Sequence, residues 1–131
     1  TKLLCPSGSS SVLILVYRRS MLQQTLDDKE TAVFLAEMGY KGSMSEMLDR
    51  LAERMCEQIQ HELGVFLGYP LCDVKGFMEN HGTGYLLSGY WKVYGDTRKA
   101  KITFAKIRIS RRNCLKMYDA GLSFRSVVGA F

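Results

Sequence analysis

Long hydrophobic runs are missing from this sequence. The longest, residues 12–17, is far shorter than the roughly 20 apolar residues that a membrane-spanning helix needs. The N-terminal residues show no signal-peptide organisation. Only two of the 131 residues are proline, and the absence of a long polar tract argues against extensive disorder. We therefore expect a folded, cytoplasmic protein without a membrane span.

Closely spaced cysteine pairs are also missing. The four cysteines stand at positions 5, 56, 72 and 114, so the sequence contains no Cys-x-x-Cys clip. With 47% hydrophobic residues, a chain of this length can build a core without disulfide bonds. We interpret the cysteines as reduced thiols, and the sequence predicts no cofactor.

The length fits one domain, and the order of apolar runs and turn residues indicates its class. We predict a hairpin over 2–17, helices within 20–60, a strand–helix–strand unit over 63–94, a basic helix over 97–118 and a short terminal helix. Strands that alternate with helices are typical of a mixed or parallel sheet. The prediction is a single α/β domain with a small mixed sheet of about four strands under helical cover.

Individual segments differ in how clearly they are patterned. Ser43 and Glu46 form a capping box, and the helix behind it has apolar residues on one face of a 3.6-residue period. Residues 12–17 do not alternate, so we expect a central strand covered on both faces. Residues 63–67 are predicted as a short buried strand, and residues 85–94 as a long aromatic strand.

The charge is distributed unevenly. Residues 97–116 hold eight basic side chains and no acidic one, while the rest of the chain has a net charge of −3. At 100° per residue, five of these side chains fall within about 80° of one another on one helix. This basic stripe consists of Arg98, Lys101, Arg108, Arg112 and Lys116. Such a stripe could meet phosphates in nucleic acid or an anionic membrane surface. The simpler explanation is a solvated face, or a face that docks on the acidic residues Asp49, Glu53 and Glu57 of another helix.

Arg111 lies in the middle of the apolar side of the same helix. Its neighbours on that side are Ala100, Phe104, Ile107, Cys114 and Tyr118. A buried arginine without a partner is very unfavourable. We therefore expect either a helix break near 109–111 or a carboxylate or ligand that meets Arg111.

Two corners are candidates for ligand binding. Gly68-Tyr69-Pro70 and Tyr94-Gly95-Asp96 each join a predicted strand to a helix, where free N–H groups favour anions. If the two strands are parallel, both corners lie on one rim that carries Tyr69, Tyr94 and Lys92. The alternative is that glycine and proline only make tight turns there.

A thiol or metal site is the other chemical possibility. Cys72 is expected in the first turn of a helix, which lowers a thiol pKa, and it could pair with His61 or His81. Cys56, His61, Cys72 and His81 could also form a zinc set, but their spacings differ from those of structural zinc sites. A small, semi-buried cysteine is the simpler interpretation. We therefore assign neither catalytic residues nor metal ligands.

Two motifs resemble a known family. Gly-Val-Phe-Leu-Gly-Tyr-Pro-x-x-Asp-Val-Lys-Gly-Phe-Met-Glu-Asn covers 64–80, and Gly-Tyr-Trp-Lys-Val-Tyr-Gly-Asp covers 89–96. With Val-Tyr-Arg-Arg at 16–19 and His61-Glu62, they resemble the bacterial domain-of-unknown-function family three-seven-nine-three, from about Leu3 onward. The resemblance implies a protein of anaerobic bacteria with no assigned activity or catalytic residues.

The resemblance also bears on the N-terminal end. Full-length members carry an N-terminal segment with a Cys-Ala-Pro-Thr-Leu-Ala-Gly-like motif, and Cys5-Pro6-Ser7-Gly8 is not that motif. We therefore expect a truncated or short member. The family usually has an acidic residue where Cys72 stands, so this thiol looks incidental.

The sequence is compatible with three functional hypotheses. The leading hypothesis is a non-catalytic binding domain for an anionic ligand or nucleic acid, with contacts from the basic stripe, Arg111, Tyr69, Lys92 and Tyr94. The second is a thiol- or metal-dependent activity of Cys72 with a histidine. The third is an interaction module for an acidic protein. The sequence favours a binding domain over an enzyme.

Overall fold

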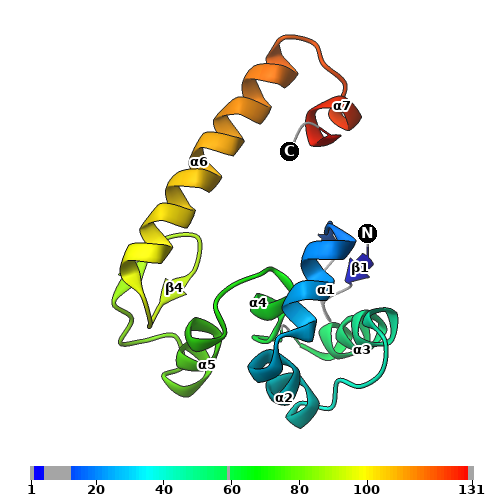
Figure 1. Cartoon of the computed structure of the whole chain (residues 1–131), viewed down its shortest axis with the longest axis vertical. Coiled ribbons are helices and arrows are strands. Elements are labelled where there is room, and N and C mark those ends of the chain that lie inside the picture. The colour runs from blue at the N-terminus through cyan, green and yellow to red at the C-terminus, as the bar shows by residue number, and fades with distance from the viewer. Residues whose placement is uncertain (1, 5–12, 59, 130–131) are drawn as a thin grey trace. The chain divides into compact units, whose positions relative to one another are not determined.

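The computed structural model describes residues 2–4, 13–58 and 60–129. The chain divides into two compact units, an N-terminal unit (Thr1–Thr83) and a C-terminal unit (Gly84–Phe131), and most of their elements are labelled in Figure 1. We predicted a single domain, and this division into compact units does not test whether the whole chain unfolds in one step. In the described ranges, no helix is both long and apolar enough to cross a bilayer.

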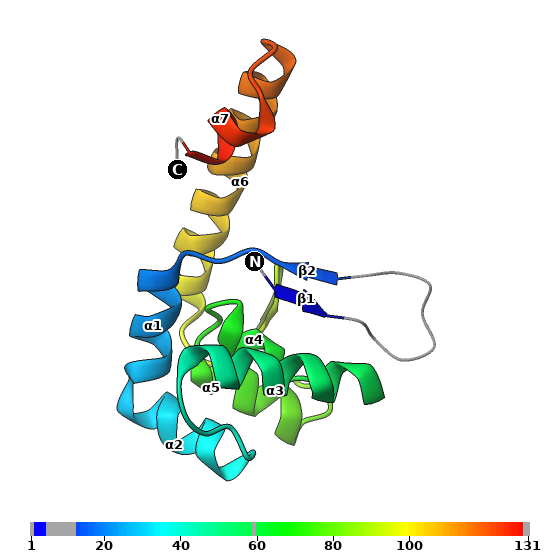
Figure 2. The ribbon, with the colours of Figure 1, turned by 90° about the vertical axis from the view of Figure 1, so that its right-hand side faces the viewer.

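The N-terminal unit is mostly helical. Its elements are β1 (Lys2–Leu4), β2 (Leu13–Leu15), α1 (Arg19–Asp27), α2 (Lys29–Glu37), α3 (Met44–Glu57), α4 (Leu63–Phe66) and α5 (Leu71–Glu79). The predicted hairpin is confirmed where it is described, because β1 and β2 pair antiparallel beside α3 (Figure 2). The turn predicted at residues 6–10 lies outside the described residues.

Local capping begins two of these helices. At α3, the Ser43 hydroxyl accepts a hydrogen bond from the Glu46 N–H, and the Glu46 carboxylate accepts one from the Ser43 N–H at 2.6 Å. The predicted capping box is therefore confirmed. At α2, the Asp28 carboxylate accepts a hydrogen bond from the Thr31 N–H at 3.0 Å. These bonds stabilise the ionised carboxylates, so the pKa of Asp28 and that of Glu46 are both lowered.

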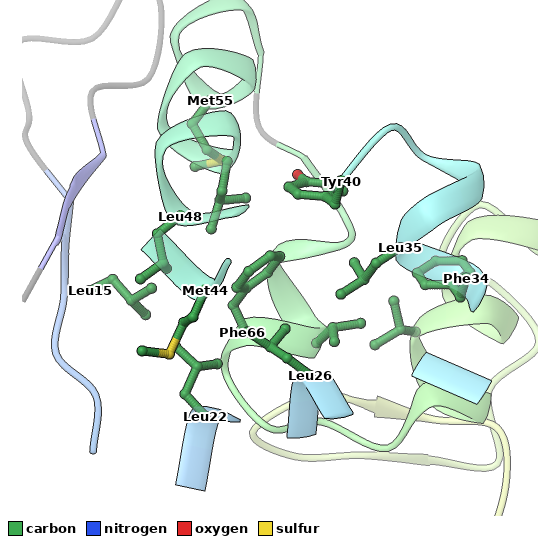
Figure 3. Close-up of a cluster of buried hydrophobic side chains, with 13 residues drawn as sticks. Leu15, Leu22, Leu26, Phe34, Leu35, Tyr40, Met44, Leu48, Met55 and Phe66 are labelled. Carbon is green, nitrogen blue, oxygen red and sulfur yellow. The ribbon is translucent and has the colours of Figure 1, made fainter. Parts of the chain in front are cut away.

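One apolar cluster joins the elements of the N-terminal unit. Leu15 of β2 and Leu22 of α1 reach the same interior as Leu48 of α3 and Phe66 of α4 (Figure 3). The predicted apolar face of α3 forms its centre, where Leu51 is 0% exposed. This cluster accounts for the fold of the unit.

The predicted single mixed sheet is not confirmed. Within the described residues, the strands form two separate antiparallel pairs, β1–β2 and β3–β4, and each strand has only two or three residues. Helices dominate both units. The central-strand prediction for 12–17 is wrong, because Leu13 and Ile14 of β2 are exposed.

The predicted strand at 63–67 is also wrong, because these residues form α4 and a turn. A five-residue apolar run does not distinguish a strand from a buried helical turn. Tertiary packing decides here. A Cβ added at Gly64 would lie 3.0 Å from Val74 Cγ2 and 3.1 Å from Tyr69 Cδ2, so glycine permits this close approach. α4 ends at Phe66, and Gly68, whose φ is +78°, takes the C′ position after the Leu67 C-cap.

The C-terminal unit contains a small hairpin and a long helix. Its elements are β3 (Leu87–Ser88), β4 (Lys92–Val93), α6 (Thr97–Asp119) and α7 (Phe124–Gly129). The predicted long strand over 85–94 is wrong, because the chain reverses between β3 and β4. At the turn, the Gly89 N–H donates to the Trp91 carbonyl at 3.1 Å, and a Cβ on Gly89 would overlap the Phe104 ring.

The core of the C-terminal unit is small. Val93 of β4 packs with Ala100 and Phe104 of α6, and Leu87 and Trp91 cover them. The Trp91 and Phe104 rings meet edge to face, with centroids 4.6 Å apart. The hairpin thereby holds only the first two turns of α6.

Candidate functional site

The segment predicted as the basic helix forms α6, which runs without a break for 23 residues. Asp96 begins it, because its carboxylate accepts hydrogen bonds from the Arg98 and Lys99 N–H groups at 3.0 and 3.1 Å. Its length is about 34 Å at 1.5 Å per residue. The five stripe residues therefore lie on one continuous helix, which Figure 1 labels as α6.

Each member of the basic stripe is exposed: Arg98, Lys101, Arg108, Arg112 and Lys116. Within the described residues, none of these five side chains forms an ion pair. Lys99, which lies off the stripe, is 3.9 Å from Asp96. The stripe thus presents five cations that no carboxylate of the described chain neutralises.

The boundary between the units also divides the charge. The C-terminal unit has ten basic and two acidic residues, Asp96 and Asp119, for a net charge of +8. The N-terminal unit has eight basic and eleven acidic residues, for a net charge of −3. The positive charge of the protein is therefore a property of the C-terminal unit.

Arg111 has neither of the local explanations predicted for it. The helix does not break at 109–111, and no carboxylate in the described part of the chain pairs with Arg111. The physical reason is that the apolar side of α6 is open here, so the guanidinium is exposed to solvent. The third expectation, that a ligand meets Arg111, is not tested by contacts within the chain.

The predicted rim is wrong because its two parallel strands do not exist. Tyr69 follows α4 in the N-terminal unit, where burial raises its pKa. Lys92 and Tyr94 belong to the hairpin of the C-terminal unit, and Lys92 Nζ lies 5.0 Å from the Tyr85 ring centroid. Desolvation also raises the pKa of Tyr94. The structure brings Lys92 and Tyr94 into the unit of the basic stripe, but not Tyr69.

The geometry does not support an activated thiol. Cys72 does lie in the first turn of α5, but burial and then the charge of Asp73 raise its pKa. The His61 ring packs on Phe77 at 5.0 Å, and no described hydrogen bond joins Cys72 to either histidine. Among the described residues, no group of three His, Cys, Asp or Glu side chains could hold a metal. The proposed zinc set is therefore not assembled.

A buried polar cluster in the N-terminal unit was missed by the sequence analysis. Glu62 is 1% exposed, and its Oε1 accepts hydrogen bonds from Arg54 Nε at 2.7 Å and from the Tyr40 hydroxyl at 2.9 Å. Arg54 Nη2 also donates to Gln60 Oε1 at 3.1 Å. The sequence signal that could have indicated it is that the acidic Glu62 stands directly before the apolar run 63–67. The contacts are satisfied internally, so the cluster has a structural role.

The N-terminal unit also contains an open cavity of about 420 Å³ between β2, α1 and α4. Gly68 of the predicted corner borders it, but Tyr69 does not. Three apolar side chains on its lining, Val16, Met21 and Leu67, are exposed. The sequence could not identify this cavity, because the segments that form it are distant along the chain.

Comparison with known proteins gives one match. The model of a family described as "Protein of unknown function (DUF3793)" matches residues 2–128. No curated protein matches the chain. No solved structure matches it either.

Proposed function

The chain belongs to the DUF3793 family, and from its own geometry we propose that it binds nucleic acid through the basic stripe of α6. The observation that carries this proposal is that five exposed cations lie along one continuous helix without a carboxylate partner in the described chain. Phosphate contacts dominate the affinity of proteins for nucleic acid, and they require cations that are not already neutralised.

The dimensions support a polyanion over a small anion. The five side chains extend over residues 98–116, which corresponds to roughly 27 Å along the helix axis. A single phosphate would meet only one or two of them, whereas a nucleic-acid strand presents a charge about every 3.4 Å. The contact would be made along the side of α6, because Asp96 caps its N-terminus and repels anions there.

The charge division strengthens this interpretation. A net charge of +8 confined to the C-terminal unit attracts a polyanion from a distance, while the net −3 of the N-terminal unit orients the approach. We include Lys92 and Tyr94 as candidates for an extended contact, since both lie in the same unit. Tyr69 is not part of the proposed contact.

The test is the salt dependence of binding. Fluorescence anisotropy would follow the full chain binding a labelled 20-base-pair DNA duplex and a labelled RNA single strand. If all five stripe cations meet phosphates, log K for the duplex should fall with log salt with a slope of about −4.5. Changing the five residues to Gln should remove most of that slope and weaken binding at least tenfold.

The matched control removes five charges elsewhere. Arg18, Arg19, Lys29, Lys41 and Lys75 are exposed basic residues of the N-terminal unit. Changing them to Gln gives the same total charge as the stripe variant but leaves the stripe intact. Equal loss of affinity in both variants would show that only net charge matters, and the proposal would then be wrong.

A further inference from the structure

The apolar side of α6 has the spacing of a coiled-coil seam. Its residues follow one another at intervals of three and four, the a and d positions of a heptad repeat: Phe104, Ile107, Arg111, Cys114 and Tyr118. The hairpin buries only the first of them, since Phe104 is 5% exposed. From residue 105 to residue 119, α6 contains no buried residue.

Beyond Phe104, the seam is exposed at Tyr118 (63%) and half-buried at Ile107 and Cys114. Beside the seam, Leu115 is 53% exposed, and Phe124 at the start of α7 is 74% exposed. α7 contacts α6, but it leaves these side chains open. Contiguous exposed apolar side chains mark interaction sites, and a long helix gains most of its stability from packing such a face.

Arg111 indicates which partner fits. In a pair of identical α6 helices, whether in register or antiparallel about residue 111, Arg111 would face its own copy. Arg108, which borders the seam, would add further repulsion. A second copy is therefore electrostatically unfavourable on this seam, and a carboxylate opposite Arg111 is favourable.

We infer that the seam of α6 docks an amphipathic helix of an acidic partner protein, with a carboxylate facing Arg111. The docked helix brings apolar residues at heptad spacing to cover Leu115 and Tyr118. Acidic residues at its edges lie near Arg108. The basic stripe is centred roughly 120° around the helix from the seam, so the two proposed contacts share only Arg108, at the border between them.

The probe is a labelled 21-residue peptide with Leu at its a and d positions, Glu at its edges and one Glu at the central a position. Anisotropy would measure its affinity for the full chain. A second peptide carries Lys at the central position. Arg111→Glu should weaken binding of the Glu peptide at least tenfold, and should reverse the preference so that the Lys peptide binds better.

Two controls make the result decisive. Lys106 is an exposed cation on the same helix but off both the seam and the stripe, so Lys106→Glu should change the affinity for the peptide less than threefold. Leu115→Gln should weaken both peptides. Equal effects of the 106 and 111 variants would overturn the inference, as would sedimentation showing that the chain dimerises through Leu115. Loss of DNA binding with unchanged peptide binding would concern only the stripe.

Discussion

The two units use the same residue types in opposite ways. Among the described residues, the N-terminal unit buries thirteen in one cluster and encloses Glu62 together with Arg54 and Tyr40, which donate hydrogen bonds to it. The C-terminal unit buries three described residues in its cluster and leaves the cations of α6 exposed. The first arrangement stabilises a fold, whereas the second leaves exposed the apolar and basic groups that the proposed contacts use. We therefore expect substitutions of buried residues in the N-terminal unit to affect mainly stability, and substitutions of exposed residues on α6 to affect mainly the proposed binding.

The largest expected effect comes from Arg54 in the N-terminal unit. Arg54→Met leaves the Glu62 carboxylate buried without its cation, which should lower the free energy of unfolding by about 3–5 kcal/mol. Hydrogen exchange of the α3 amides in increasing urea would measure this loss. Trp91, the sole tryptophan, reports the C-terminal unit by fluorescence, and its transition should move much less.

Two further variants sharpen that test. Arg50 forms an exposed pair with Glu53 at 3.3 Å, so Arg50→Met should lower the free energy of unfolding by less than about 1 kcal/mol. The double variant Arg54→Met with Glu62→Leu should recover part of the loss, because it removes the unpaired charge. A shift of the Trp91 transition as large as that of α3 would show that both units unfold as one domain.

A smaller and opposite pattern is expected for Gly89→Ala. The added Cβ overlaps the Phe104 ring, so the hairpin must move away from α6, which should cost about 1–3 kcal/mol. The Trp91 fluorescence transition should then shift more than exchange in α3. Gly121→Ala provides the contrast: no atom lies within 4 Å of its added Cβ, so its effect comes from the positive φ of +85° alone. An unchanged Trp91 transition in Gly89→Ala would contradict this account.

The smallest effect concerns alkaline pH. Burial, followed by the nearby charge of Glu62, strongly raises the pKa of Tyr40. Unfolded tyrosine loses its proton near pH 10, while folded Tyr40 keeps it, so stability should fall as the pH rises above about 10, by at most about 1.4 kcal/mol per pH unit. Urea midpoints of the N-terminal unit between about pH 9 and 11 would measure this slope.

Tyr40→Phe tests the assignment. It should reduce the alkaline slope, although it also removes the hydrogen bond to Glu62 and lowers stability at neutral pH. A slope that stays the same without the Tyr40 hydroxyl would assign the effect to another group.

Sequence patterns correctly predicted the helices that are specified by residues close together in the sequence. The capping box of α3 and the periodicity of α6 are set by residues three or four positions apart, and both helices were placed correctly. The basic stripe followed from the same periodicity. The strand predictions for 63–67 and 85–94 were wrong because those segments are shaped by close packing. Gly64 packs against Tyr69 and Val74, and Gly89 packs against Phe104. The apolar pattern of each segment does not encode these contacts. The cluster around Glu62 was missed for the same reason.

The two units differ in whether they contain histidine. Both histidines, His61 and His81, lie before this boundary, so the C-terminal unit contains no imidazole, the side chain whose ionisation ordinarily changes between pH 5 and 8. Its cations are all lysine or arginine. The proposed contacts of α6 should therefore respond to ionic strength, and any change in them between pH 5 and 8 should come from the partner.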